Sequence, residues 1–193
     1  EITTRLVGSE MCIRDRITDL DKKQCLTFSI PMTKDKGLLE TAYRNAADQV
    51  EEQLKAGRDV ACLTLGDPTV YSTYIYLHRL IRDRGYRTEI ISGVPSFCAV
   101  SARLGDSLAD RSQQLHIIPS AYGVEDVLKL PGTKVLMKAG SKMAAVKEAL
   151  ERECVSGVMV ENCGMENESI FQGVQEIPDK AGYYSLIVIK EQK

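Results

Sequence analysis

The residues best suited to chemistry lie in the stretch Leu63–Thr73, which reads LTLGDPTVYST. A hydrophobic run, Val60–Leu65, stops at Gly66-Asp67-Pro68, and a helical pattern begins directly afterwards. Glycine allows a ligand close to the backbone, and aspartate accepts hydrogen bonds from neighbouring amides. Because α/β proteins bind ligands at the carboxyl ends of their strands, this turn predicts a ligand site. The alternative is a plain strand-to-helix turn, for which Asp-Pro is a common signal.

Three more hydrogen-bonding side chains follow in the first turn of the expected helix, namely Tyr71, Ser72 and Thr73. Helix capping needs fewer hydrogen-bonding side chains than these three, so their presence favours ligand binding. A second loop, Ser92–Phe97 (SGVPSF), follows the next expected strand and again places a hydroxyl after a glycine at the start of a helix. Two such loops at neighbouring strand ends predict one shared site, and two unrelated turns are the alternative.

The elements that must position these loops alternate between strands and helices. We expect strands at 25–30, 60–65, 88–91, 115–119, 134–137, 158–161 and 183–190, and helices at 38–55, 69–84, 97–104 and 141–152. The nearly all-apolar run at 60–65 predicts a strand buried on both faces of a parallel sheet. The short connections favour right-handed βαβ units. The sequence therefore predicts an α/β fold, mostly parallel in its first half and mixed in its second.

The polar segment Gly105–Gln114 is the expected domain boundary. It gives an N-terminal α/β domain over residues 25–110 and a C-terminal α/β domain over residues 111–193. Residues 1–24 are expected to lie outside the fold as an artefact-like or disordered terminus. The reason is that Leu6–Arg16 (LVGSEMCIRDR) has neither a core pattern nor the layout of a signal peptide.

Composition argues against several classes of function. The 193 residues carry a formal net charge of −2, which gives no sign of a nucleic-acid partner. No apolar run approaches the ~20 residues of a membrane span. Six cysteines without a CxxC pair predict buried free thiols, no metal site and a cytoplasmic location. The two histidines, His78 and His116, lie among apolar residues and are expected to be packed rather than catalytic.

Four segments together resemble the tetrapyrrole methylase family: SIPMTKD at 29–35, LTLGDPTVYST at 63–73, EIISGVPSFCAVSARLG at 89–105 and LHIIPS at 115–120. The resemblance covers about Leu26 to Lys190. It implies two α/β domains with S-adenosylmethionine folded into the cleft between them, usually in a homodimer. It also implies methylation of carbon 20 of precorrin-2, or of its cobalt complex, in cobalamin biosynthesis.

Three alternatives remain open at this point. Another methylase of the same fold would act on a different tetrapyrrole position or on a modified protein histidine, as a diphthine-type methylase does. A truncated chain would bind ligand without catalysis. A generic nucleotide-binding α/β protein would share the single turn but not the combination of GDPTVYST with GVPSF.

The resemblance implies a role for eleven cofactor-binding residues: Leu65, Gly66, Asp67, Tyr71, Ser72, Thr73, Ser96, Phe97, Met137, Cys163 and Ser185. Methyl transfer from a sulfonium mainly requires alignment, which fits a sequence without a catalytic dyad. If a base is needed, Tyr71 is the candidate. A substrate with many carboxylates predicts basic residues nearby, and placement favours Lys34, Arg103, Arg111 and Lys138.

One departure from the family pattern concerns the amino terminus. The family opens with a strand and a glycine-rich loop of the form GxGxGD, which this sequence does not contain. Either the amino terminus is truncated or the chain has lost part of its cofactor and substrate site, and we expect truncation because the sequence from Cys25 onward still resembles an intact member.

Overall fold

The computed structural model describes residues 2–6, 23–31, 33, 35–119 and 124–191. The chain divides into two compact units, Glu1–Pro95 and Ser96–Lys193. Both are α/β units, as the sequence predicts. The division precedes the predicted boundary at 110/111, because helix α4 (Ser96–Leu104) lines a cavity with strand residues Val158 and Val188 of the second unit.

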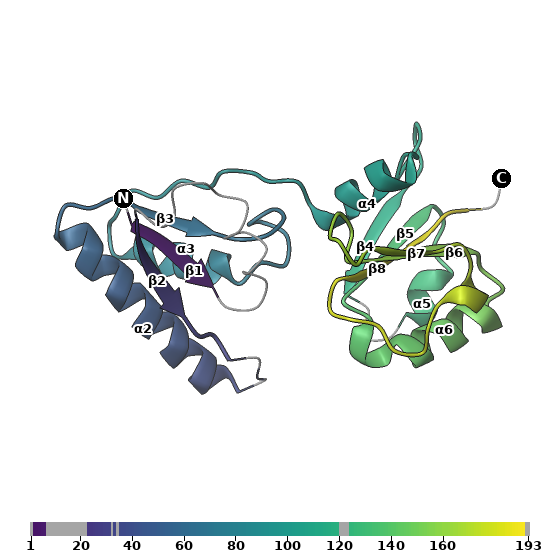
Figure 1. Ribbon diagram of the computed structural model, residues 1–193, viewed down its shortest axis with the longest axis horizontal. Coiled ribbons are helices and arrows are strands. Elements are labelled where there is room, and N and C mark those ends of the chain that lie inside the picture. The colour runs from purple at the N-terminus through teal and green to yellow at the C-terminus, as the bar shows by residue number, and fades with distance from the viewer. Residues whose placement is uncertain (1, 7–22, 32, 34, 120–123, 192–193) are drawn as a thin grey trace. The chain divides into compact units, whose positions relative to one another are not determined.

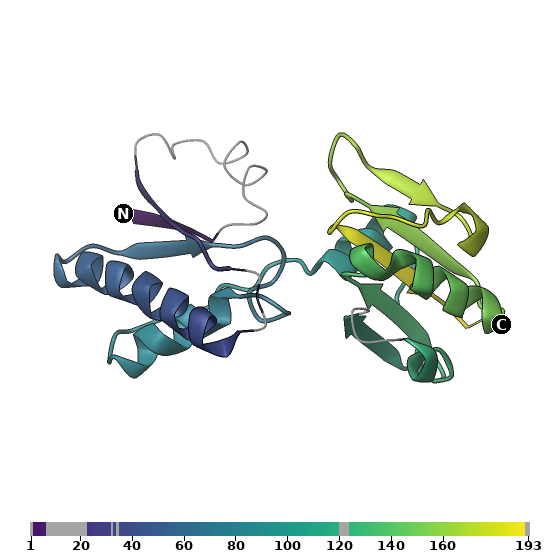
Figure 2. The ribbon, with the colours of Figure 1, turned by 90° about the horizontal axis from the view of Figure 1, so that it is seen from below.

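The first unit contains a three-stranded sheet in the order β2-β1-β3, and both pairings are parallel. Helices α2 and α3 lie on the same face of this sheet (Figures 1 and 2). Its core consists of Phe28, Ala46, Ala47, Val50, Leu77 and Ile81. The elements are β1 (Ile2–Leu6), β2 (Gln24–Phe28), α2 (Lys36–Lys55), β3 (Val60–Leu63) and α3 (Tyr74–Asp83).

Strand β1 corrects the expectation that residues 1–24 lie outside the fold. It is the central strand of the first sheet, and Thr3 pairs with both Cys25 and Ala61. The remainder of the LVGSEMCIRDR segment, from residue 7 on, lies outside the described residues. Long-range pairing therefore defines a strand that the local sequence does not reveal.

Helix α2 follows the sequence prediction closely. Its N-cap is Asp35, whose Oδ1 accepts hydrogen bonds from the backbone N–H groups of Gly37 (2.8 Å) and Leu38 (3.1 Å). This is the favoured way to satisfy the free donors of a helix start. The chain leaves the helix through Gly57, whose φ of 74° suits a glycine.

The second unit contains a five-stranded mixed sheet in the order β4-β5-β8-β6-β7. Strand β4 runs parallel to β5, and the other neighbours are antiparallel. Helix α4 lies on one side of the sheet and α5 and α6 on the other (Figure 1). Every residue of β5 and β8 is buried. After α4 come β4 (Leu115–Pro119), α5 (Glu125–Leu128), β5 (Thr133–Met137), η3 (Gly140–Lys142), α6 (Met143–Arg152), β6 (Gly157–Glu161), β7 (Ser169–Phe171), η4 (Val174–Glu176) and β8 (Ser185–Ile189).

Three local predictions in the first unit are wrong. Residues 88–91 are not assigned to a strand, although Thr-Glu-Ile-Ile favours one, because strand formation depends on a pairing partner. Strand β3 is not buried on both faces: Ala61 is exposed and Cys62 half-buried, since the described helices cover one face only. The helix expected from Thr69 begins at Tyr74.

The cysteines are free thiols in the described part of the chain, but none is buried. Cys25, Cys98 and Cys154 are exposed, and Cys62 and Cys163 are half-buried. The prediction of buried thiols was wrong because apolar neighbours in sequence fix the element but not the face on which a side chain lies. Across the described ranges, no group of three residues is arranged to hold a metal ion, and no helix has the length and apolarity of a bilayer span.

His78 and His116 are both half-buried. The ring of His78 packs against Tyr74 with centroids 5.8 Å apart. The Nε2 of His116 lies 2.9 Å from the Pro131 carbonyl oxygen. These contacts agree with the predicted packing role.

Candidate functional site

Asp67 ties the two predicted loops of the first unit together. Its Oδ2 accepts hydrogen bonds from the Ser92 hydroxyl (2.6 Å) and the Gly93 N–H (3.0 Å). Its Oδ1 accepts from the N–H of Thr69 (2.8 Å) and from the Thr69 hydroxyl. Hydrogen bonds therefore join the two loops, although the second loop does not follow a strand, and the shared ligand site stays a prediction.

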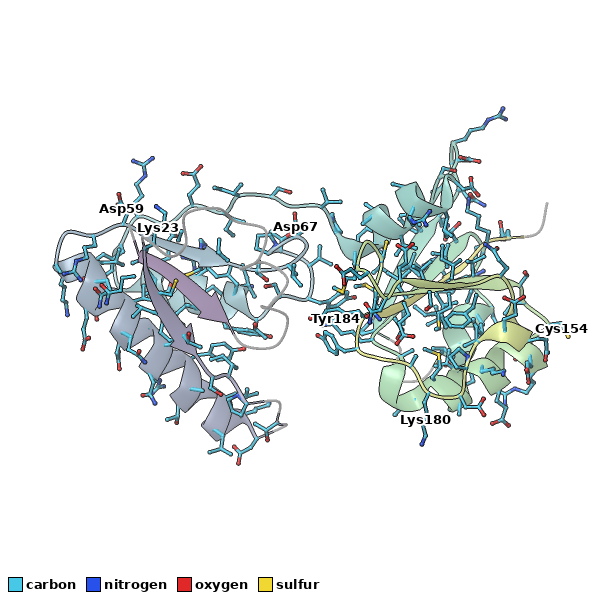
Figure 3. All side chains as sticks on the ribbon, in the orientation of Figure 1. Lys23, Asp59, Asp67, Cys154, Lys180 and Tyr184 are labelled. Atoms are coloured by element: carbon cyan, nitrogen blue, oxygen red, sulfur yellow. The ribbon has the colours of Figure 1, made fainter. Side chains whose placement is uncertain are left out.

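The carboxyl of Asp67 is buried and remains charged. Hydrogen bonds from the Ser92 hydroxyl, the Thr69 hydroxyl and the Thr69 N–H stabilise the carboxylate, and the Gly93 N–H adds to them. Together they hold the pKa of Asp67 well below its usual range. Figure 3 shows Asp67 at the end of the sheet opposite Lys23 and Asp59, which directly precede β2 and β3. A permanent negative charge thus lies beyond the carboxyl ends of the parallel strands.

The two loops approach each other so closely that only glycine fits at the contact. A Cβ on Gly93 would lie 2.1 Å from the carbonyl oxygen of Gly66. Gly66 itself has a φ of 74°, in the left-handed region that favours glycine. Both glycines are therefore required by the backbone path at this site.

The predicted hydroxyl-bearing residues precede α3 instead of forming its first turn. Tyr71 has a φ of 51°, which is unusual for a tyrosine. The Ser72 Oγ accepts from the Tyr74 N–H (3.3 Å) and lies 3.4 Å from the Thr64 Oγ1. Thr73 occupies the N-cap position without a capping bond from its side chain. The site thus has a non-helical segment rich in hydroxyls beside the Asp67 assembly.

Several apolar side chains on these loops are exposed. Leu65 is 37% exposed, Tyr71 49%, Val94 67% and Ile91 81%. Hydrophobic side chains of this size beside a few convergent polar groups are typical of a ligand site. These loops are therefore the candidate ligand surface of the first unit.

In the second unit, the predicted residues Met137, Cys163 and Ser185 gather at one end of the sheet. Met137 ends β5, and Ser185 begins β8 opposite Glu161 at the end of β6. Cys163 follows two residues after that strand. Figure 3 shows Tyr184, which precedes β8, at the end of the sheet opposite Cys154. The structure therefore brings together three residues that are widely separated in sequence.

The backbone at this end of the sheet is tightly fitted. The Ser185 hydroxyl donates to the Gly182 carbonyl (2.9 Å), and the Gly182 N–H donates to Glu161. A Cβ on Gly140 would lie 2.7 Å from the Ala181 carbonyl oxygen. Lys138 and Asn162, which follow β5 and β6, have φ values of 57° and 54°. Left-handed residues that are not glycine concentrate at functional sites.

Cys163 lies in a loop with Glu168, which also contacts Arg103 of α4. Burial and the neighbouring Glu168 carboxylate raise the pKa of the Cys163 thiol, so the sulfur stays protonated at neutral pH. Ser96 and Phe97 begin α4; Ser96 is exposed and Phe97 is buried. The second unit therefore contributes two groups of predicted cofactor residues, at the sheet end and at the start of α4.

The four basic residues predicted to bind substrate have different surroundings. Lys34 lies outside the described residues. Arg103 donates from Nε to Glu168 (2.7 Å), and Arg111 is exposed with a φ of 50°. The Lys138 Nζ lies 5.6 Å from the centroid of the Tyr183 ring, a cation–π contact. Lys138 directly follows the predicted cofactor residue Met137, and Arg103 is linked through Glu168 to the loop of Cys163.

Sequence reasoning did not identify Gly93, Glu168 or Tyr183 as site residues. Gly93 lies inside the SGVP motif, and the sequence signal for it was that this turn resembles the earlier glycine turn at Gly66. Glu168 lies 65 residues from its partner Arg103, so only the fold reveals the pair. Tyr183 precedes a strand, and its contact with Lys138 has no local signature.

Comparisons with known proteins identify relatives over most of the chain. Residues 4–177 match the family model described as Tetrapyrrole (Corrin/Porphyrin) Methylases. A probable cobalt-precorrin-2 C(20)-methyltransferase of Methanocaldococcus jannaschii is 31% identical over 90% of this chain and 76% of its own. The cobalt-precorrin-2 C(20)-methyltransferase of Salmonella typhimurium is 29% identical over 93% and 78%.

Solved structures share the fold at lower identity. A uroporphyrin-III C-methyltransferase from Thermus thermophilus, complexed with S-adenosyl homocysteine, matches with a TM-score of 0.68 and 15% identity. The match covers 98% of this chain and 85% of that one. The similarity confirms the predicted α/β fold.

Proposed function

This chain belongs to the tetrapyrrole methylase family and is an S-adenosylmethionine-dependent C-methyltransferase, and we propose that it methylates carbon 20 of precorrin-2 or of its cobalt complex. Two relatives named as cobalt-precorrin-2 C(20)-methyltransferases, alike over about three quarters of their length, support this position and favour the cobalt complex. The reaction would serve cobalamin biosynthesis, which is the expectation that the resemblance gave.

The residues present fit such a cofactor. The exposed apolar side chains of Leu65, Tyr71 and Val94 suit an adenine ring, and the hydroxyls of Ser72 and Thr73 suit its polar substituents. The charged carboxylate of Asp67 favours a cationic ligand nearby. When bound, the cofactor would supply a methyl group already activated as a sulfonium.

The protein's own contribution to this reaction is alignment. The methyl group of the bound cofactor would pass to an electron-rich ring carbon and leave a neutral thioether, so covalent catalysis would not be needed; a base would take the proton that the methylated carbon loses. Holding the two reactants at attack distance is worth up to ~7–11 kcal/mol in favourable cases. The rigid Asp67 assembly and the fitted sheet end of the second unit support this role. Tyr71, which is exposed beside that assembly, stays the candidate for a base.

We propose cofactor contacts for the residues that the resemblance implies, in each unit taken by itself. In the first unit they are Leu65, Gly66, Asp67, Tyr71, Ser72 and Thr73, and in the second Ser96, Phe97, Met137, Cys163 and Ser185. Lys138, Arg111 and Lys34 would bind substrate carboxylates, for which charged donors are suited. A homodimer and a cytoplasmic location also stay predictions.

The observation that carries the proposal is that Asp67 joins the two loops by hydrogen bonds. The sequences of both loops resemble the cofactor loops of the family. The test supplies isotope-labelled S-adenosylmethionine with precorrin-2, its cobalt complex or a panel of other tetrapyrroles, and follows product mass. We expect transfer of one methyl group to precorrin-2 or its cobalt complex in preference to the others. Transfer only to another tetrapyrrole, or to a modified protein histidine, would contradict the proposal.

A further inference from the structure

The carboxylate of Glu168 organises the loop that follows β6. Its Oε2 accepts a hydrogen bond from the Gly164 N–H (2.7 Å), and its side chain also contacts the thiol of Cys163. The side chain is only 14% exposed. Buried carboxylates that accept backbone N–H groups fix a loop more strongly than neutral acceptors do, because such bonds are charge-assisted.

The loop itself is compact and needs this support. The Met165 N–H donates to the Asn162 carbonyl (2.9 Å), and the Glu168 N–H donates to the Met165 carbonyl (3.1 Å). Asn162 and Gly164 both have left-handed backbones, with φ values of 54° and 75°. An asparagine in this conformation is strained to a small degree, so the loop keeps its shape only if the surroundings over-determine it.

Arg103 fixes the other oxygen of the same carboxylate. Its Nε donates to Oε1 of Glu168 at 2.7 Å. Arg103 lies in the last turn of α4, the helix that begins with Ser96 and Phe97. The pair therefore joins the helix that presents one group of cofactor residues to the loop that presents Cys163. Both partners lie in the second unit, so the link belongs to one compact body.

We propose that Glu168 and Arg103 are positioning residues, which hold the Asn162–Gly164 segment and α4 in the geometry needed to bind the cofactor. The proposal rests on the proposed function for the cofactor but not on the identity of the tetrapyrrole. It assigns Arg103 a different role from the substrate binding that its charge suggests. An arginine whose Nε already donates to a carboxylate of the same unit links two elements of the fold.

The pKa of the Cys163 thiol provides a second test of this proposal. The Glu168 charge raises the pKa of the thiol, whereas the Arg103 charge lowers it. Glu168→Gln should therefore increase the thiolate fraction at a fixed pH, and Arg103→Met should decrease it. Loss of either partner should also loosen the loop and expose the sulfur, which accelerates alkylation; this adds to the charge effect in Glu168→Gln and opposes it in Arg103→Met.

The test combines four variants in the full chain. They are Glu168→Gln, Arg103→Met, the conservative Arg103→Lys, and Arg152→Met as a matched control. Arg152 also lies in the last turn of a helix of the second unit, pairs with Glu125 and is 54% exposed, against 55% for Arg103. Calorimetry measures affinity for S-adenosylhomocysteine, and peptide mass spectrometry measures the rate at which iodoacetamide alkylates Cys163.

We expect Glu168→Gln and Arg103→Met to weaken S-adenosylhomocysteine binding by about three- to tenfold, the range for one lost charge-assisted hydrogen bond that is partly exposed. Arg103→Lys should restore most of the affinity, and Arg152→Met should match the wild type. Cys163 should be alkylated faster in Glu168→Gln than in the wild type and faster than in Arg103→Met, because only in Glu168→Gln do the charge effect and the loosening act in the same direction. Wild-type affinity in both Glu168→Gln and Arg103→Met, or wild-type alkylation of Cys163 in Glu168→Gln, would overturn the proposal. A wild-type chain that binds the cofactor product but does not methylate carbon 20 would instead refute the proposed function.

Discussion

Replacing Gly93 with alanine tests the contact between the two loops of the first unit. The new Cβ would lie 2.1 Å from the Gly66 carbonyl oxygen, whereas real Cβ atoms do not approach closer than 3.0 Å. The loops must therefore separate by roughly 0.9 Å, which is the difference between the two distances. The atoms that the new Cβ would meet belong to the backbone of Gly66 and Asp67, so no flexible side chain can move aside to accommodate the methyl group.

A shift of this size breaks the hydrogen bond that closes the site. The Gly93 N to Asp67 Oδ2 distance would grow from 3.0 Å to about 3.9 Å, outside hydrogen-bond range. Overpacking of this kind costs about 1–3 kcal/mol of unfolding free energy. A misplacement of ~1 Å at a site that works by alignment lowers activity by ~100-fold. We therefore expect a folded protein whose kcat/KM falls by about 100-fold.

Three measurements check this expectation. Circular dichroism confirms folding, urea titration gives the loss of stability, and methyl transfer gives kcat/KM. Gly173→Ala is the matched control, because its Cβ would meet nothing within 4 Å and its φ of 170° is ordinary extended backbone. The control should lie within ~0.5 kcal/mol of the wild type. A folded Gly93→Ala protein with wild-type kcat/KM and wild-type S-adenosylhomocysteine affinity would refute the reasoning.

Three further predictions concern charge and packing. The depressed pKa of Asp67 stabilises the folded protein at pH values above the ordinary carboxyl pKa of ~3.9, and this stability is lost as the pH falls through the pKa of the folded state. Urea titrations from pH 7 to pH 2 should therefore show that acid lowers the unfolding free energy less in Asp67→Asn than in the wild type. Equal decreases in the two proteins would contradict this prediction. Charge reversal in Lys138→Glu should weaken tetrapyrrole binding while calorimetry shows S-adenosylhomocysteine binding nearly unchanged, and parallel loss of both would exclude a substrate role. Leu136→Ala, at a side chain with no exposed surface, should lower the unfolding free energy by about 2–5 kcal/mol, and a loss below ~1 kcal/mol would show that the second core relaxes around the cavity.

Local patterns in the sequence identified the elements whose residues lie on one periodic face. Helix α6 is an example, because the predicted inward residues Met143, Val146 and Leu150 are all buried. The role of the turn at Asp67 as a ligand loop stays a prediction, but the turn itself was predictable because glycine, aspartate and proline act locally there. Its bonds to Ser92 and Gly93 were not, since residues 25 and 26 positions away leave no mark on the local pattern.

The wrong predictions share one cause. Distant parts of the chain decide which strands pair and which side chains are buried. Ile2–Leu6 is a central strand because it pairs with a strand on each side. Thr88–Ile91 has the composition of a strand, but the structure does not assign it to one. Cys98 follows the buried Phe97 yet lies on the exposed side of α4. The Arg103–Glu168 link likewise depends on the packing of α4 beside the second sheet.

The position of the transferred methyl group tests the central claim most directly. The protein would be incubated with cobalt-precorrin-2 and S-adenosylmethionine labelled with ¹³C in its methyl group, and the product examined by ¹³C NMR. We expect one new methyl resonance, which long-range ¹H–¹³C correlation assigns to a methyl group on the meso carbon at position 20. A labelled methyl group on any other carbon of the macrocycle would contradict it.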